Sequence, residues 1–365
     1  MRQRVVFLCA SVSLWLVSGT VADGQRDGVT AFVGATVMDG TGAPPVEDGV
    51  VLVSEGKIIA AGPASRVTVP PGARRIELAG RTMLPGFVNI SARMATTGRA
   101  DVEAQLLLYA RYGVTSVFSP ATATAAGMPP GNEAPVGRAR LFVTSPSIDA
   151  TTLDRAKTLL GTGADLLTRS VLDTHVDFEL VQLARSRDAC VAPALMRELS
   201  TFVYETTPSF FREAFFLRHA DRAAVARLGN REYQDAVRHD PATPRARAAF
   251  EQASRNLKQL HDAGVRIAMG TDSGAAGRFP GSFEHLELEL MVKAGLSPLQ
   301  ALVAATGDAA RCVKKAGAIG AIRPGAFADL VVLDRSPLAD IRNTRRIESV
   351  WVSGVAVDMG VDSPR

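Results

Sequence analysis

The sequence has few of the residues that bind metals or build disulfide frameworks. Its 365 residues include three cysteines and five histidines, and aromatic residues make up 6%. Cys9 lies in the N-terminal apolar segment, which leaves Cys190 and Cys312 in the rest of the chain. Both lie in apolar surroundings typical of buried thiols, and a core of this size does not need disulfides. We therefore expect two unpaired thiols and no disulfide framework.

Clustered positive charge is also absent. The chain has 41 basic and 37 acidic residues, and its arginines are scattered, with no basic run that alternates with aromatic residues. Nucleic-acid-binding proteins usually carry a basic stripe or patch. We expect no nucleic-acid partner.

Long hydrophobic runs are missing except at the N-terminus. Arg2 and Arg4 precede an apolar run over residues 5–17, and small residues follow as far as Ala22. This order is typical of a secretory signal peptide, so we expect residues 1–22 to be removed after Ala22 and the protein to be periplasmic or secreted. The run is shorter than the roughly 20 residues that span a bilayer, which makes an uncleaved anchor the less favoured alternative. No membrane span is expected after cleavage.

Both ends of the remaining chain have strand patterns. Two short apolar runs, Val50–Val53 and Ile58–Gly62, flank a turn and predict a hairpin. Three further apolar runs near the other end are Asp329–Leu333, Glu348–Val352 and Val355–Val357. We expect residues 28–80 and 321–360 to pair into one small composite β-sandwich domain.

Between residues 81 and 320, helical patterns alternate with apolar runs. Each helix ends at a glycine or a short polar break, and a run rich in Val, Ile and Leu follows, as in buried parallel strands. Six candidate strands begin near Met83, Val114, Leu141, Ala164, Cys190 and Val265. A closed (β/α)8 TIM-type barrel has eight strands. We therefore expect an α/β barrel that is truncated or distorted by one or two units.

Three further segments have a distinct character. Thr122–Gly137 is rich in Pro, Gly and Ala and reads as a loop, whereas Phe202–Pro244 is aromatic and charged and predicts a helical insertion or lid. Ser297 as the N-cap and Pro298 at the first helical position predict a helix that ends at Gly307.

Four motifs resemble landmarks of the amidohydrolase superfamily, especially its imidazolonepropionase-like and exported dipeptidase-like members. Thr82–Asn89 resembles the entry into the first barrel strand, and Met269–Gly274 resembles the last strand. Phe283–Leu290 resembles the helix after it, and Arg323–Leu330 resembles the return to the β-domain. The resemblance runs from Thr30 to Asp358. It implies hydrolysis of carbon–nitrogen bonds, such as amide or dipeptide bonds, by water activated on zinc or another divalent metal.

The resemblance also implies a ligand set of a His-x-His pair, a lysine, two further histidines and an aspartate. On this chain the His-x-His positions are Ser91 and Arg93, a later histidine falls on Arg169 and another near Asp149, and the lysine has no clear counterpart. Only Asp272 matches. Serine is a poor zinc ligand, and arginine is a fixed cation that repels metals. We expect no metal cofactor in this chain.

Other residues offer few replacements. No two histidines have a metal-binding spacing, and His285 is the one candidate pocket residue, although a structural role is favoured. Arg197 and Tyr204 are candidates to bind a substrate carboxylate or carbonyl, with packing by the nearby aromatic residues as an equal alternative. A small amide or dipeptide-like molecule is the expected ligand, and an oligomer is possible.

Burying the lone carboxylate of Asp272 would be costly. We predict that a guanidinium of Arg93 or Arg169 pairs with it and replaces the charge of the metal, unless both arginines reach solvent. Two functions follow. The chain is a catalytically impaired hydrolase that serves as a binding or assembly partner, or it is a still-active hydrolase that uses Asp272 and a non-standard metal site. The missing imidazoles favour the first.

Overall fold

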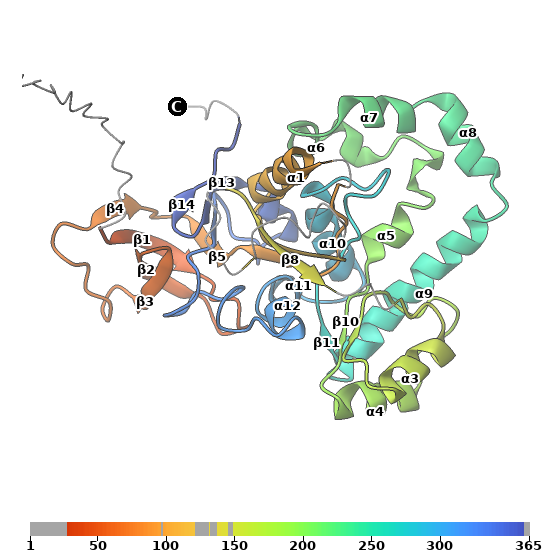
Figure 1. The fold of residues 1–365 in the computed structure, drawn as a ribbon, viewed down its shortest axis with the longest axis horizontal. Helices are drawn as coiled ribbons and strands as arrows, with labels where there is room; N and C mark the ends of the chain where they lie inside the picture. Colours follow the sequence, from red (N-terminus) through yellow and green to blue (C-terminus); the bar gives the residue numbers. More distant parts are fainter. Residues whose placement is uncertain (1–27, 96–97, 121–130, 132–136, 145–148, 361–365) are drawn as a thin grey trace, which may run out of the picture.

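A computed structural model describes residues 28–95, 98–120, 131, 137–144 and 149–360. The predicted signal peptide and most of the predicted loop at residues 122–137 lie outside the described residues. The described chain forms a curled β-sheet beside a larger region in which parallel strands alternate with helices (Figure 1).

One eight-stranded sheet combines strands from both ends of the described chain. Its order is β14-β13-β12-β5-β1-β2-β3, and β4 pairs with β1. Strand β12, from the C-terminal end of the chain, pairs antiparallel with β5, and this pairing joins the strands of the two ends into one sheet. The strands are β1 (Thr30–Val37), β2 (Val46–Ser54), β3 (Lys57–Pro63), β4 (Arg74–Glu77), β5 (Thr82–Pro85), β12 (Leu330–Leu333), β13 (Ile347–Val352) and β14 (Val355–Ala356).

This sheet curls around its own core. The backbone N–H of Ile58, at the start of β3, donates to the carbonyl of Ala326 at 2.9 Å, just before β12. The curl encloses Phe32, Ile58 and Trp351, and the rings of Phe32 and Trp351 meet edge to face. Alternating burial along the strands gives the sheet this apolar inner face.

The second region contains six short parallel strands in the described part of the chain. They are β6 (Phe87–Asn89), β7 (Val114–Pro120), β8 (Arg140–Thr144), β9 (Leu166–Leu167), β10 (Cys190–Val191) and β11 (Arg266–Ile267). They match the six predicted strands, except that the first begins at Phe87, because Met83 belongs to β5 of the other sheet.

These strands form two groups, β6-β7-β8 and β11-β10-β9. The groups are joined beyond β6 and β11, where the N–H of Ile90 donates to the carbonyl of Met269 at 3.0 Å. Between the described residues of β8 and β9, which are consecutive in the chain, no pairing is present.

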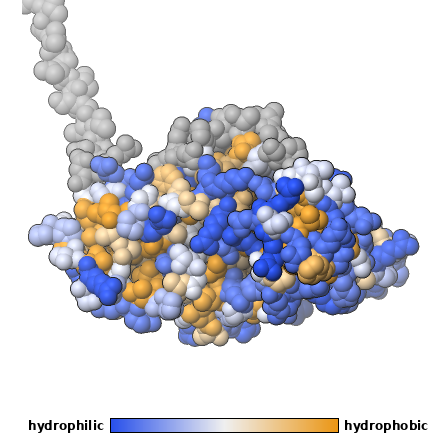
Figure 2. Space-filling view, turned by 90° about the horizontal axis from the view of Figure 1, so that it is seen from below, coloured by the Kyte–Doolittle hydropathy of each residue, from blue (hydrophilic) through white to orange (hydrophobic). Residues whose placement is uncertain are grey.

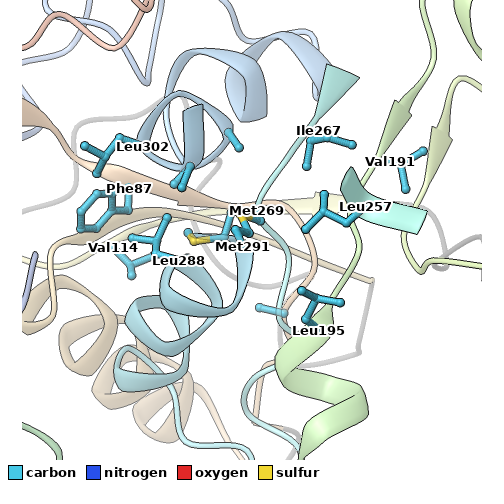
Figure 3. Close-up of a cluster of buried hydrophobic side chains, with 14 of the residues drawn as sticks. Phe87, Val114, Val191, Leu195, Leu257, Ile267, Met269, Leu288, Met291 and Leu302 are labelled. Atoms are coloured by element: carbon cyan, nitrogen blue, oxygen red, sulfur yellow. The ribbon is translucent and has the colours of Figure 1, made fainter. Parts of the chain in front are cut away.

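Helices cover these strands. They are α1 (Arg99–Arg111), α3 (Leu153–Gly161), α4 (Phe178–Ser186), α9 (Thr243–Asp262), α10 (Ser282–Lys293), α11 (Pro298–Ala304) and α12 (Gly307–Cys312). Figure 3 shows the core where α10 and α11 meet the strands, with Leu288, Leu302 and Phe87 in one apolar cluster.

The predicted helix after Ser297 begins as expected but ends earlier. The Ser297 hydroxyl accepts from the N–H of Gln300, and the Gln300 side chain accepts from the N–H of Ser297 at 2.7 Å, which forms a capping box. The helix ends at Ala304, and Gly307 opens α12 instead. Gly307 lies so close to the carbonyl of Gly40 that a Cβ atom would be 2.2 Å from it.

The predicted helical insertion is present. It contains α6 (Ala214–Leu217), α7 (Arg222–Leu228), α8 (Arg231–His239) and the 3-10 helices η1 (Val203–Glu205) and η2 (Ser209–Arg212), and the short helix α5 (Leu195–Leu199) precedes it. Its aromatic residues form a separate core that includes Tyr204, Phe211 and Phe216. Helices α7 and α8 lie on the side of the molecule away from the eight-stranded sheet (Figure 1).

Cys190 and Cys312 form a disulfide, with Cα atoms 5.7 Å apart. The prediction of two unpaired thiols is therefore wrong. The apolar surroundings of both cysteines are one shared core beside Ile90 and Ile319, which β10 and α12 both enter. The two residues are 122 positions apart, so their spacing gave no sign of this meeting.

No helix in the described ranges is long and apolar enough to cross a membrane. Figure 2 shows one face of the molecule, on which apolar side chains are interspersed with hydrophilic ones.

Candidate functional site

The predicted site residues gather beyond the carboxyl ends of the parallel strands. Ser91 and Arg93 follow β6, Arg169 follows β9, and Asp272 follows β11. Arg197 lies in α5, the short helix after β10. In TIM barrels this face carries the active site, because loops from several strands converge there.

The carboxylate of Asp272 is fixed in place by its backbone. Its φ of 53° lies in the left-handed region, and its N–H donates to the carbonyl of Ser91 at 2.7 Å. Only 4% of Asp272 is exposed. Aspartate tolerates this conformation better than most residues, so the turn can aim a carboxylate inward without a glycine.

Three arginines surround this carboxylate. Arg93 Nε donates to Asp272 Oδ1 at 2.7 Å, Arg278 Nη1 donates to Oδ2, and Arg197 Nη1 lies 3.4 Å from Oδ2. The predicted pairing of a guanidinium with Asp272 is therefore confirmed for Arg93. Sequence reasoning missed Arg278, which lies in a loop without a motif.

Arg169 does not pair with Asp272, so Arg93 is the one of the two candidate arginines that makes the predicted contact. Its Nε and Nη2 donate to Glu198 Oε1 and Oε2 at 2.5 and 2.8 Å. Glu198 is almost buried and offers the bidentate geometry that arginine prefers. Burial opposes the charge of Arg169, but the hydrogen bonds and charge of Glu198 outweigh it and raise the pKa of Arg169.

Arg197 connects the two groups. Its Nη2 lies 3.3 Å from Asp149 Oδ2, and Arg169 Nη1 lies 3.9 Å from the same oxygen. These seven side chains are the arginine network, which contains Arg93, Arg169, Arg197, Arg278, Asp149, Glu198 and Asp272. With every member ionised, four cations face three anions, and the network carries one excess positive charge.

Arg278 lies in the same network and is largely shielded from solvent. Burial lowers its pKa, the charge of Asp272 opposes this effect, and the charges of Arg197 and Arg93 lower the pKa further. Burial is therefore the main cause of the lowered pKa.

The residues at this site do not fit a divalent metal. Zinc needs several imidazole, thiolate or carboxylate donors that converge at about 2.0–2.2 Å. Here Asp272 is the one residue that matches the ligand set implied by the resemblance, and both of its oxygens accept hydrogen bonds from arginines. Within the described ranges, no group of three or more His, Cys, Asp or Glu side chains could hold a metal ion.

His285 does not reach the site. It is fully buried in α10, and its ring nitrogens lie 2.9 Å from Thr344 Oγ1 and 2.8 Å from the carbonyl of Tyr112. Burial lowers the pKa of His285 to about 3, so the ring is neutral at pH 7. His285 therefore has a structural role and is not a pocket residue.

Tyr204 is also structural. It is buried against Phe211, and its hydroxyl donates to the carbonyl of Gly277, next to Arg278. Burial raises the pKa of Tyr204, so the phenol stays protonated. Its contribution to the site is to hold the loop that carries Arg278.

Two buried glutamates that sequence reasoning missed support the network. Glu284 Oε1 accepts from Asn89 Nδ2 at 2.5 Å, Thr271 Oγ1 at 2.9 Å and Ser273 Oγ at 2.6 Å, and so fixes the turn at Asp272. Burial raises the pKa of Glu284. A signal was available, because glutamate on the buried face of a helix needs partners.

Glu287 supports the other side of the network. Its two oxygens accept from the backbone N–H groups of Leu195 and Met196 at 2.9 and 2.5 Å, at the start of α5. Burial raises the pKa of Glu287 to about 8. The bonds position the helix that carries Arg197 and Glu198.

Comparisons with known proteins agree with the arrangement of these elements. A sequence model described as the amidohydrolase family matches residues 181–357, from α4 to the last strand. Over these residues the chain is similar to the amidohydrolase family. The predicted resemblance is therefore confirmed.

Individual relatives match shorter segments. Ochratoxinase from Aspergillus niger is 38% identical over 97 residues, which are 25% of this chain and 19% of that protein. A 5-methylthioadenosine/S-adenosylhomocysteine deaminase from Symbiobacterium thermophilum is 46% identical over 72 residues, 19% of this chain and 16% of that protein. The matched segments thus span less than a fifth of either curated relative.

The fold similarity extends further. A solved structure of molinate hydrolase superposes with a TM-score of 0.68 and 17% identity, covering 92% of this chain and 96% of that chain. The shared fold is the amidohydrolase fold, a TIM barrel with a β-sandwich. At this identity the similarity shows the fold alone.

Proposed function

We propose that this chain is a catalytically impaired amidohydrolase, descended from metal-dependent hydrolases of carbon–nitrogen bonds, in which the arginine network takes the place of the metal centre. One observation carries the proposal. Arg93, at the second position of the His-x-His pair, donates directly to Asp272, the one retained ligand. The guanidinium supplies the positive charge that the metal supplies in the family.

Electrostatics explains why the two arrangements exclude each other. A divalent ion beside Asp272 would lie close to the guanidinium groups of Arg93, Arg197 and Arg278. At roughly 5 Å and an effective dielectric constant of about 20, each arginine would repel the ion by about 7 kcal/mol. The attraction between the ion and the one carboxylate of Asp272 does not offset the repulsion from three guanidinium groups.

The incomplete barrel supports the same proposal. The described residues between β8 and β9 contain one helix, α3, and these two strands do not pair. We infer that the barrel has lost up to two units at this position. The resemblance assigns the lysine ligand of the family to this part of the chain, so its loss removes a metal ligand as well.

Export is part of the proposal. The N-terminal pattern predicts a signal peptide that is cleaved after Ala22, and the buried disulfide between Cys190 and Cys312 is of the kind that persists in oxidising compartments. Fractionation of expressing cells and N-terminal sequencing of the exported protein test this expectation. A chain that stays in the cytoplasm with its N-terminus intact would contradict it.

The catalytic part is tested by hydrolysis assays on the purified mature protein with amide and dipeptide substrates, with and without added zinc. We expect no turnover above a matched Asp272→Asn variant under either condition. Zinc-dependent turnover that the variant lacks would overturn the proposal and favour an active hydrolase with a non-standard metal site.

A further inference from the structure

We propose that a cavity at the amino-terminal end of β11 binds one apolar residue of an extended, uncharged peptide, which adds to the free edge of this strand. The cavity has a volume of about 400 Å³. Asp272 and the arginine network lie beyond the opposite end of β11, so the inference does not depend on the proposed function. The lining includes Gly42, Arg266, Ile267, Leu299, Val303 and Ala304.

The backbone of Ile267 faces this cavity. Strand β11 pairs with β10 on one side, where the N–H of Ala268 donates to the carbonyl of Val191 at 3.0 Å. Backbone groups of successive residues in a strand point to alternate sides, so the N–H and C=O of Ile267 point away from β10. The N–H of Met269 points to the same side as that of Ile267, and it donates to the carbonyl of Ala304 in α11 at 2.8 Å. The free groups of Ile267 therefore face α11, which forms one wall of the cavity.

These two backbone groups have no partner of their own. Neither the N–H nor the C=O of Ile267 forms a hydrogen bond with any residue that the structure describes, although only 2% of Ile267 is exposed. More than about 90% of buried backbone groups are hydrogen-bonded. A ligand for this position must offer both an acceptor and a donor. An extended peptide residue offers its own C=O and N–H in this arrangement, as in strand addition to a sheet edge.

The free edge is only one residue long. On its carboxyl side, the bond from Met269 to Ala304 closes the edge. On its amino side, the N–H of Val265 donates to the carbonyl of Leu260 in α9 at 3.0 Å, where the chain leaves the helix. The cavity therefore takes one residue of a short peptide and not a long strand.

An apolar wall beside the edge selects the side chain of the ligand. Leu299 and Val303 are four positions apart in α11, so their side chains lie on the same face of the helix, and both are partly exposed. Gly42 closes this side, since a Cβ atom on it would lie 3.5 Å from Val303 Cγ2. A branched apolar side chain can be buried between these residues.

The arginines of the lining are already paired within the chain. Arg266 Nη1 donates to Asp188 Oδ1 at 2.8 Å, and Arg311 Nη1 donates to Asp308 Oδ1 at 2.8 Å. The site therefore does not require a charged group on the ligand, and an uncharged residue such as leucine fits it.

Hydrogen exchange, measured by NMR on the purified protein, tests the free edge. We expect the amide of Ile267 to exchange at least tenfold faster than that of Ala268, because only Ala268 donates to Val191. Adding N-acetyl-leucine methylamide should slow the exchange of Ile267 and leave that of Ala268 unchanged. Equal protection of the two amides in the protein alone would overturn the inference.

A titration of the wild-type protein with two matched probes tests the hydrogen bonds to the ligand. N-acetyl-leucine methylamide should bind saturably in calorimetry. Its derivative with a methyl group on the leucine nitrogen has no donor for the carbonyl of Ile267 and should bind about tenfold more weakly. Equal affinities, or no saturable binding of the first probe, would contradict strand addition.

Two variants locate the site. Leu299→Trp fills the cavity and should weaken binding of N-acetyl-leucine methylamide at least tenfold. Ile59→Trp adds the same side chain at an exposed position of β3 and should leave the affinity unchanged. Thermal unfolding shows whether both variants fold. If a folded Leu299→Trp variant binds the probe as tightly as the Ile59→Trp control, the ligand does not occupy this cavity.

Discussion

Arg93 and Asp272 join the first and last described barrel strands by a hydrogen bond of 2.7 Å between Nε and Oδ1. In the family this position between the strands belongs to a metal and its ligands. Under the proposed function, a side chain attached to β6 by only a few residues takes this position, and the charge it supplies is covalently part of the protein. The charge therefore cannot be removed by a chelator.

The ion pairs of Asp272 should contribute to stability. Replacing Asp272 with asparagine leaves Arg93, Arg197 and Arg278 together without their shared carboxylate, and removing one partner of a buried ion pair typically costs about 3–5 kcal/mol. Urea unfolding measures this loss. The matched control is Asp188→Asn, because Asp188 pairs with Arg266 with 80% of its side chain exposed. The control should cost at most about 1 kcal/mol. Equal effects of the two variants would show that the network is not stabilising.

A second buried ion pair connects the barrel to the eight-stranded sheet. Arg140 in β8 donates to Asp329 Oδ2 at 2.7 Å and Oδ1 at 3.1 Å, and it lies over the ring of Phe327 at 3.6 Å from the centroid. Asp329 also accepts from the N–H of Ser353 at 2.8 Å. We expect Asp329→Ala to destabilise the fold by about 3–5 kcal/mol in urea unfolding, because it removes the carboxylate that pairs with the buried guanidinium of Arg140. A loss of stability smaller than that caused by removing an exposed ion pair, such as the pair of Asp188 and Arg266, would contradict the proposed role of Asp329.

The disulfide should be a large contributor to stability. It closes a segment with a sequence separation of 122, and restricting the unfolded chain over such a loop is worth about 4–5 kcal/mol. Urea unfolding with and without a reducing agent measures the effect. The double variant Cys190→Ser and Cys312→Ser should be less stable and should not respond to the reductant. A wild-type protein that also fails to respond, although its thiols titrate as free after reduction, would contradict this prediction.

His285 should make the fold sensitive to acid. Its pKa is about 3 in the folded protein and about 6.5 in unfolded chains, so the unfolded state binds more protons in this range. Its contribution to stability is full above pH 6.5 and is lost as the pH falls toward 3.

A His285→Gln variant isolates this effect, because the acidic groups Glu284 and Glu287 titrate in both proteins. The variant keeps a donor and an acceptor for Thr344 and Tyr112 but cannot be protonated. We expect the difference in unfolding free energy between wild type and variant to narrow between pH 6.5 and 4. A difference independent of pH would contradict the burial of a neutral ring.

Local sequence patterns predicted the elements that depend on neighbouring residues. The N-cap at Ser297 and five of the six predicted strand positions follow from residues close together in the chain. The location of Asp272 beyond a strand end followed instead from the resemblance of Met269–Gly274 to the last barrel strand of the family.

Contacts between distant segments were not predictable in this way. Arg169 pairs with Glu198 because α5 brings a second carboxylate within reach, and no pattern near Arg169 indicates that helix. Arg278 and the disulfide were missed for the same reason. Each depends on where a loop or helix returns after many residues, which periodicity and spacing do not encode.

A zinc titration followed by calorimetry and metal analysis tests the replacement of the metal by arginine most directly. The wild-type protein should bind no zinc at this site, since Arg93, Arg197 and Arg278 repel it. A variant with Ser91→His and Arg93→His regains two imidazoles beside Asp272 and should bind zinc measurably better than wild type. Stoichiometric, tight zinc binding by the wild-type protein that is lost in Asp272→Asn would contradict the central claim.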